Sequence, residues 1–339
     1  MIKIAIDAMG GDAGLATTLP GIISFSHSYK SDDIEFVVYG DGSLIEKYFA
    51  QNPCQCIYSI INTGSKIISC NEEPIHAIKN SRGTSMYESI RAVSDGMADA
   101  VVSSGNTGAY MVLSKLLVGT IDGVLRPALG NVIPTKTGRT IMLDLGANTD
   151  CTAEKLFQFA KMGKAVAMIL LNKRNPIIGL LNIGTERIKG TEILGRTYDL
   201  ISQDNSLNFK GFVEGNNITD GSVDVVVTDG FTGNVVLKSI EGSVKLVAEI
   251  LKEEIKSNIL SRIGYLLGLK KVFNNMRKNF NPSLHNGAPF VGLNKVVVKS
   301  HGSSENIGFA HAIQTAVELV RNNFVESIKN SLGEFNGEC

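Results

Sequence analysis

One repeated pattern constrains the fold of this chain more than any other feature. Seven times, a short apolar run ends in a loop rich in Gly, Asp, Asn, Ser or Thr. The runs are nearly continuous rather than alternating, which is typical of strands covered on both faces. Stretches with helical spacing lie between most of them, at 84–97, 153–171, 191–202 and 235–256. The seven segments are 3–12, 34–42, 100–109, 140–148, 177–186, 223–234 and 294–304.

Alternating strands and helices predict an α/β fold with a largely parallel sheet. In such sheets ligands bind beyond the carboxyl ends of the strands, where the polar loops of this chain lie. Glycine allows close backbone approach, and the following helices direct their first N–H groups into the same space. We therefore expect an anion-binding cleft assembled from several loops. The alternative for any single loop is an ordinary tight turn.

Composition supports a globular, cytoplasmic protein. Of the 339 residues, 43% are hydrophobic and 19% charged, which argues against disorder. No signal peptide is visible, and no window reaches the roughly 18 apolar residues that a spanning helix needs. The five cysteines are scattered, without a usual zinc or redox spacing, and are interpreted as reduced thiols. We expect a single catalytic domain over residues 1–339.

Charge is distributed unevenly although the formal net charge is zero. Residues 255–304 contain several lysines and arginines but no Asp or Glu, so this segment should attract acidic partners or anionic lipid. Helical spacing, interrupted by Gly264 and Gly268, predicts a protruding helical hairpin over 245–282. Either the hairpin packs on the core or its apolar tip touches a membrane. The tip residues are Tyr265, Leu266, Leu267 and Leu269.

Several reaction classes lack their motifs in this sequence. There is no dinucleotide-binding G-x-G-x-x-G after the first strand, no P-loop, no H-E-x-x-H and no G-x-S-x-G. Asp7, Asp144 and Asp229 follow strands and either bind a metal or orient loops; we expect the second role and predict no metal and no cofactor. The basic segment interleaves aliphatic rather than stacking aromatic residues, so no nucleic-acid partner is predicted.

Eight blocks, in order from residue 2 to about residue 320, resemble the bacterial phosphate acyltransferase (PlsX) family. One block alone would carry little weight, but the colinear series is specific. One departure is clear: Ala13, Gly14 and Leu15 follow Asp12, where the family usually has His-Ala-Pro. The blocks are IAIDAMGGD, SSGNTGA, RPAL, LDLGAN, NKRNPIIGLLNIGTERIKG, GFVEGNNI, TDGFTGNVVLKSIEG and GAPFVGLNKVVVKSHGSSENIGFAHAI.

The resemblance implies that a fatty acyl group passes from acyl carrier protein to inorganic phosphate, forming acyl phosphate for phospholipid synthesis. It also implies a Rossmann-like α/β/α layered fold related to phosphotransacetylases and the isocitrate dehydrogenase group. A homodimer that associates peripherally with an anionic membrane surface is expected. The alternatives are a short-chain phosphotransacetylase using coenzyme A, an isocitrate-type dehydrogenase, and a membrane-attached scaffold that binds acyl carrier protein.

Such a reaction asks the protein for a phosphate cradle, a thioester slot and donors for an oxyanion. Arg126 is a candidate phosphate clamp, with a surface ion pair as its alternative. His301 either donates to the carbonyl oxygen or the thiol, or is structural. Donors to phosphate or to the oxyanion, with turn formation as the alternative, are expected from Asn106, Thr107, Thr232 and Asn234, and more weakly from Asn148 and Asn182.

Four charged residues complete the predicted site. Glu186 and Lys189 either form an ion pair that shapes their loop or contact substrate. Asp7 and Asp229 border the expected phosphate position, and we expect them to hold loops, because a bare carboxylate repels phosphate. The residues expected nearest to the chemistry are Asn106, Asn234 and His301.

Overall fold

Two β-sheets form the centre of the protein in the computed structural model, which describes residues 1–29, 33–69, 72–257 and 286–333 together with 268 and 271. The larger sheet has seven strands in the order β3 (Ile57–Asn62), β2 (Ile34–Gly40), β1 (Ile2–Asp7), β4 (Ala100–Ser103), β12 (Val296–Lys299), β11 (Ala288–Val291) and β5 (Ala128–Leu129). The smaller has five, in the order β6 (Asn131–Thr135), β7 (Gly138–Leu143), β10 (Val225–Val227), β8 (Ile177–Leu181) and β9 (Asn208–Val213).

Most neighbouring strands run parallel, as the sequence predicts. Strands β3, β2, β1, β4 and β12 are parallel in one sheet, and β7, β10, β8 and β9 in the other. The strands β11, β5 and β6 supply the antiparallel pairs. Each of the seven apolar segments contains a strand. The predicted sheet is divided, however, because the segments contribute to two sheets that meet where Gly130 joins β5 to β6.

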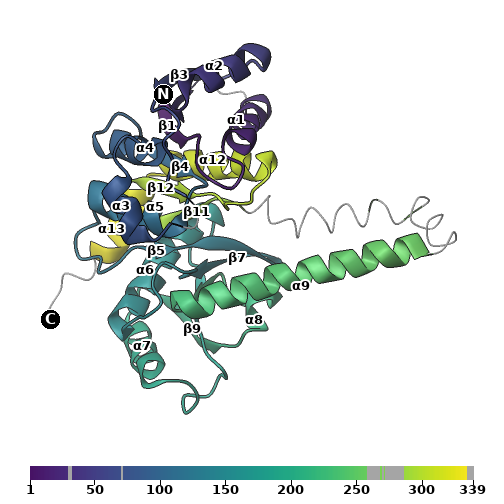
Figure 1. Cartoon of the computed structure of the whole chain (residues 1–339). Coiled ribbons are helices and arrows are strands. Elements are labelled where there is room, and N and C mark those ends of the chain that lie inside the picture. The colour runs from purple at the N-terminus through teal and green to yellow at the C-terminus, as the bar shows by residue number, and fades with distance from the viewer. Residues whose placement is uncertain (30–32, 70–71, 258–267, 269–270, 272–285, 334–339) are drawn as a thin grey trace.

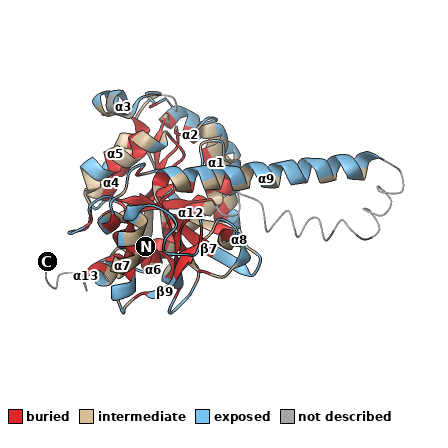
Figure 2. Cartoon of the chain, turned by 90° about the horizontal axis from the view of Figure 1, so that it is seen from below, coloured by how far each residue is buried: buried red, intermediate tan, exposed pale blue. Residues whose placement is uncertain are grey.

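Helices cover both faces of the two sheets. One apolar cluster contains residues of both sheets and packs against α1 (Leu15–Ser28), α2 (Gly42–Gln51), α6 (Ala153–Leu170), α7 (Glu192–Gln203), α12 (Asn306–Arg321) and α13 (Phe324–Gly333). A second cluster on the opposite face packs against α3 (Pro74–Asn80), α4 (Ser85–Ser94), α5 (Thr107–Val118), α8 (Asn217–Asp220) and the start of α9 (Gly230–Ser257). The buried residues in Figure 2 follow these layers. The Rossmann-like α/β/α prediction is confirmed.

Side-chain caps explain where several helices begin. The oxygens of Thr84, Asn106, Thr152 and Thr191 each accept a hydrogen bond from a backbone N–H in the first turn that follows. Such caps satisfy N–H groups that have no partner inside the helix. Consequently α4, α6 and α7 begin and end within a few residues of the ranges predicted from spacing alone.

Helix α9 begins five residues earlier than predicted, at Gly230 instead of Val235. Asp229 precedes it and accepts hydrogen bonds from Thr232 N (2.8 Å) and Thr232 Oγ1 (2.7 Å). The glycines of TDGFTGN therefore belong to a helix and not to a loop. Beyond its first turns α9 extends away from the body of the protein as a long rod (Figure 1), and most of its outer residues are exposed.

The predicted hairpin over 245–282 is covered only in part. Its first portion is the end of α9, whereas Tyr265, Leu266, Leu267 and Leu269 lie outside the described residues. Within the described ranges, no helix is both long enough and apolar enough to cross a membrane. The single domain over 1–339 stays a prediction.

Candidate functional site

The polar loops that follow β1, β4 and β12 contact one another, because these three strands are neighbours in the larger sheet. Asp12 N donates to Gly302 O over 3.0 Å, and Ser104 Oγ donates to Gly10 O over 2.8 Å. A Cβ atom on Gly10 would lie 2.8 Å from Gly105 N, so only glycine allows the first two loops to approach this closely. The loops thus form one connected edge.

The side chain of Asp7, at the end of β1, connects this edge to neighbouring elements. Its carboxylate is fully buried and accepts hydrogen bonds from Ser85 Oγ and Ser103 Oγ, both over 2.6 Å. Burial raises the pKa of Asp7, while the two hydroxyl hydrogen bonds act in the opposite direction. With both oxygens occupied and no exposed surface, Asp7 orients the loops, which is the role preferred from sequence.

In the smaller sheet, Asp144 organises the equivalent edge after β7. This buried carboxylate accepts from Leu129 N (2.9 Å), Ala147 N (3.1 Å) and Asn148 N (2.6 Å), and also from the Asn148 amide (2.8 Å). Because Leu129 belongs to β5 of the larger sheet, one side chain connects the two sheets. Burial raises the pKa of Asp144.

The first turn of α9 lies directly against this Asp144 loop. Gly230 N donates to Asn148 O over 2.7 Å. A Cβ on Gly230 would lie 2.6 Å from Asn148 O, and a Cβ on Gly233 would overlap Asp144 O. Both glycines therefore permit backbone contact between a helix and a loop. As a result, the N-terminus of α9 sits at the edge where the phosphate site was predicted.

Three nitrogen groups gather where the two halves of the molecule meet. Lys238 of α9 places its Nζ 3.1 Å from His301 Nε2, in the loop after β12. Lys299, at the end of β12, is only 6% exposed, and its ammonium donates to Ser104 O over 3.3 Å and to Ser300 O. A buried ammonium held by two backbone carbonyl oxygens is a local source of positive potential.

The imidazole of His301 is held in the neutral form by this environment. Partial desolvation and the nearby Lys238 ammonium lower the pKa of His301, with a smaller contribution from Lys299. Lys238 Nζ lies 3.1 Å from Nε2, while Ser303 N donates to Nδ1 over 3.3 Å and Ser303 Oγ lies 2.9 Å from the same nitrogen. Donors thus face both ring nitrogens. Asn286 Oδ1 accepts from His301 N over 3.0 Å and fixes the backbone.

Three predicted donors are already engaged within the protein. Asn106 caps α5, and its amide donates to Ser69 O (3.2 Å) and Glu72 O (2.9 Å). Asn148 is 2% exposed, with its amide on Pro127 O and Asp144. The Asn182 amide donates to two carbonyls of its own loop. The structure gives each a positioning role, and direct contact with substrate stays a prediction.

Other predicted residues are exposed at the same edges. Thr107 and Asn234 are open to solvent, and Arg126 has no acidic partner within 4 Å among the described residues. Glu186 and Lys189 form an exposed ion pair of 2.9 Å, as one of the two alternatives predicts, and contact with substrate stays a prediction. Thr232 is occupied with Asp229 as described above.

Two functional candidates were missed by sequence reasoning. Lys299 carried a signal, since a lysine ends an otherwise apolar strand, VVVK. Lys238 carried none, because its contact with His301 spans 63 positions in sequence. Among the described residues no group of His, Cys, Asp or Glu could hold a metal ion. Cys151 is no nucleophile at neutral pH, because burial raises the pKa of its thiol to about 11.

Comparison with known proteins finds relatives that match nearly the whole chain. A family model described as "Fatty acid synthesis protein" matches residues 2–327. A phosphate acyltransferase from Legionella pneumophila (strain Corby) is 41% identical over 336 residues, covering 98% of this chain and 97% of the relative. A phosphate acyltransferase from Bordetella petrii is 43% identical over 323 residues, covering 94% of this chain and 90% of the relative.

The fold also matches a solved structure of a phosphotransacetylase from Streptococcus pyogenes. The two share a TM-score of 0.60 and 15% sequence identity, over 96% of this chain and 94% of the other. At that identity the likeness concerns the fold alone. The two phosphate acyltransferases, by contrast, are 41–43% identical to this chain over nearly its full length. This similarity shows that the chain belongs to the phosphate acyltransferase family, a family of transferase enzymes.

Proposed function

We propose that this protein transfers a fatty acyl group from acyl carrier protein to inorganic phosphate and releases acyl phosphate. The observation that carries the proposal is the meeting of Lys238, Lys299 and His301 between the loop edges of the two sheets. We propose that a phosphate dianion binds near these three groups, where Lys238 also pairs with Glu241 over 2.7 Å. Family membership supports the same reaction class.

The reaction needs little proton transfer from the protein. A phosphate oxygen attacks the thioester carbon, the C–S bond breaks, and the electron pair leaves with sulfur as a thiolate. A thiol of this kind has an ordinary pKa of about 8.5, so the leaving group is stable near neutral pH. The protein contributes by holding phosphate against the carbonyl carbon and by donating hydrogen bonds to the developing oxyanion.

Arg126 is proposed as the second anchor for phosphate. It directly precedes Pro127, whose carbonyl accepts from the Asn148 amide over 2.8 Å, so its backbone is tied to the Asp144 loop. Its guanidinium is exposed and has no acidic partner among the described residues. A guanidinium can grip two phosphate oxygens at once, which a lysine cannot. Asn234 and Thr107, both exposed, are proposed to approach the same ligand.

Acyl carrier protein is proposed as the acyl donor and an anionic membrane surface as a peripheral partner. Both would be attracted by the basic segment 255–304, although much of that segment, including the apolar tip, lies outside the described residues. A homodimer is proposed from α9, whose exposed apolar residues recur at whole-turn spacings along one side. Four of them form this stripe, Phe231 (65% exposed), Val235 (51%), Leu246 (58%) and Ile250 (49%), and a fifth, Val247 (53%), lies beside it.

A product assay tests the reaction directly. Acyl-loaded acyl carrier protein is mixed with the enzyme, with and without phosphate, and thiol release is followed while the products are analysed by mass spectrometry. We expect phosphate-dependent thiol release and a mass corresponding to acyl phosphate. Acetyl-coenzyme A serves as the parallel substrate. Turnover of acetyl-coenzyme A without turnover of the protein-bound thioester would favour the short-chain alternative instead.

Variants of two exposed arginines test the role of Arg126 in the same assay. Arg126→Ala should raise the apparent KM for phosphate by about 10-fold or more, since a hydrogen bond to a charged group contributes roughly 1.5–3 kcal/mol. Its KM for acyl carrier protein should change little. Arg174→Ala, at an exposed turn before β8, is the matched control. A larger effect on acyl carrier protein than on phosphate would remove Arg126 from the phosphate site.

A further inference from the structure

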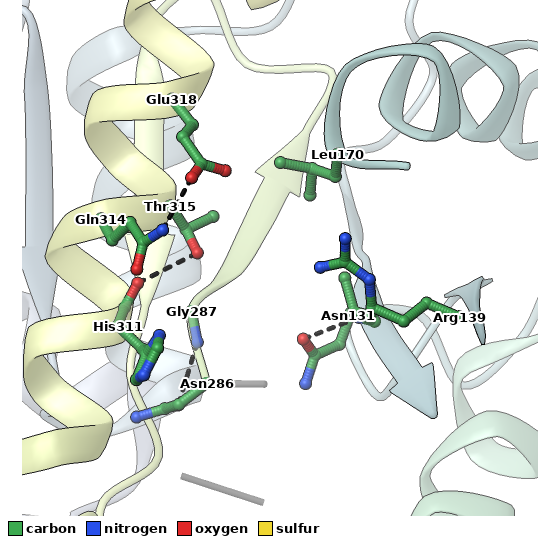
Figure 3. Close-up of a pocket in the computed structure, with 10 residues that line it drawn as sticks. Asn131, Arg139, Leu170, Asn286, Gly287, His311, Gln314, Thr315 and Glu318 are labelled. Carbon is green, nitrogen blue, oxygen red and sulfur yellow. Dashed lines mark hydrogen bonds between the residues drawn. The ribbon is translucent and has the colours of Figure 1, made fainter. Parts of the chain in front are cut away.

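A separate polar pocket lies between α12 and the β6–β7 hairpin, on the side of the molecule where the two sheets meet (Figure 3). Its volume is about 150 Å³, smaller than the roughly 300–1,000 Å³ of pockets for drug-sized ligands. An occupant must therefore be small. The lining residues are Asn131, Val132, Arg139, Leu170, Asn286, Gly287, His311, Gln314, Thr315 and Glu318.

The available donors in this pocket come from β6 and β7. Arg139 of β7 makes no ion pair with any described residue, and Figure 3 shows its guanidinium beside Asn131 and directed toward α12. Asn131 Oδ1 accepts from Val132 N over 2.8 Å, which leaves the NH₂ group of this amide without a partner among the described residues. A guanidinium and an amide NH₂ side by side are donors suited to an oxyanion.

The remaining polar groups of the pocket are mostly satisfied by α12 itself. Thr315 Oγ1 donates to His311 O over 3.1 Å. The carboxylate of Glu318 accepts from Gln314 Nε2 over 2.8 Å and lies more than 4 Å from the Arg139 guanidinium. The carboxylate consequently forms no ion pair with Arg139. It borders the pocket at one end and limits how far an anion could extend.

The pocket is distinct from the site that contains His301. Asn286 stands between them and turns its polar atoms to the His301 loop, donating to Ser300 Oγ and Ser304 Oγ, both over 2.8 Å, and accepting from His301 N. Gly287, the next residue, lines the pocket and packs closely on α12, since a Cβ there would lie 2.8 Å from Ala312 Cα. The pocket and the proposed catalytic edge thus share a wall but not their donors.

We propose that this pocket binds a small oxyanion, a phosphate or carboxylate group, through Arg139 and Asn131. The inference does not depend on the proposed reaction, because neither residue belongs to the proposed catalytic edge. Histidines provide a separate reporter for each place: His311 lines the pocket, and His301 lies at the catalytic edge. Their signals can be assigned with the variants His311→Gln and His301→Gln.

The test is a ¹H NMR titration of the full chain with sulfate, and then with acetate, without acyl substrate. We expect a saturable shift of the His311 signal. Arg139→Gln should weaken the apparent affinity for the anion at least 10-fold, and Arg139→Lys should weaken it less, because lysine keeps the charge but lacks the paired N–H donors of a guanidinium. The His301 signal should respond alike in all three proteins. Arg174→Gln is the control for lost surface charge.

Comparing the responses to sulfate and acetate shows whether the pocket prefers a phosphate-like or a carboxylate ligand. A response to sulfate and not to acetate identifies a phosphate-like ligand, and the reverse identifies a carboxylate. If neither anion moves the His311 signal saturably, or if Arg139→Gln leaves the affinity unchanged, the proposal is overturned. Failure of the product assay with an intact His311 response would refute only the proposed reaction.

Discussion

At the scale of single residues, the candidate site depends on charges that oppose one another at short range. Lys238 and Lys299 both disfavour a proton on His301, whereas Glu241 and Asp12 favour one. Glu241 also accepts from Lys238 over 2.7 Å, so the acid is partly occupied by the same lysine. Desolvation, the largest cause, and this balance of charges together leave the pKa of His301 below its ordinary value.

Lys238→Met should therefore raise the pKa of His301 toward its ordinary value of about 6.5, since desolvation still lowers it. The variant removes the nearest cation and frees Glu241, and both changes favour the protonated ring. The measurement is an NMR titration of the His301 signal, assigned with His301→Gln. Lys47→Met, at an exposed position on α2, is the control. An unchanged His301 pKa in Lys238→Met would show that the two side chains do not interact in solution.

The same shift has a consequence for stability. The unfolded chain binds a proton at this position below about pH 6.5, while the folded imidazole stays neutral to a lower pH. Folding therefore loses stability as the pH falls from about 6.5 toward the pKa of the folded state. This loss should be smaller in Lys238→Met than in the unmodified protein when both are unfolded with urea across that range.

At the scale of elements, the loop after β7 is stabilised by a single buried carboxylate. Asp144→Ala leaves the N–H groups of Leu129, Ala147 and Asn148 without an acceptor. Each orphaned donor costs about 1–3 kcal/mol, so we expect a loss of roughly 3 kcal/mol or more in the free energy of unfolding. Urea unfolding measures it. Asp150→Ala, exposed in the same loop, should change it by less than about 0.5 kcal/mol. Equal effects of the two substitutions would contradict this assignment.

Sequence reasoning located the seven strands that it predicted, but it did not predict β3, β5, β6, β9 and β11, and it misplaced the start of α9. Continuous apolar runs identified all seven predicted strand positions, because burial on both faces leaves a strong pattern. Gly230 and Gly233 were interpreted as a loop. They lie in α9, and they are glycines because a side chain there would strike the backbone of the Asp144 loop, a contact between positions far apart in sequence. The pairing of Lys238 with His301 was hidden for the same reason.

At the scale of the whole molecule, the protein has two sheets where one largely parallel sheet was predicted. The chain passes from β5 to β6 through Gly130, and Leu145 N donates to Leu129 O over 3.0 Å across the same junction. Each apolar cluster includes residues of both sheets, so the halves share continuous layers of core. The loop edges of both sheets consequently contribute to the candidate site, with α9 on one side and the loop after β12 on the other.

Helix α9 then requires an explanation, because an isolated helix in water gains little stability from its own hydrogen bonds. Among the described residues, its early part packs on the body through Val236, Leu237 and Ile240. The stripe of Phe231, Val235, Leu246 and Ile250 remains uncovered in one chain. A second copy that presents the same stripe would bury both, as two-fold symmetric dimers do. The proposed homodimer accordingly places its interface on this stripe.

Charge introduced into the stripe should dissociate the dimer. The double variant Leu246→Glu/Ile250→Glu places four carboxylates in a two-fold interface, where like charges repel and pay for desolvation. We expect a dimer mass for the unmodified protein and a monomer mass for the variant in sedimentation velocity at micromolar concentration. Lys252→Glu, which the helical period places off the stripe, should remain dimeric. A dimeric double variant would move the interface elsewhere, and a monomeric unmodified protein would refute the homodimer itself.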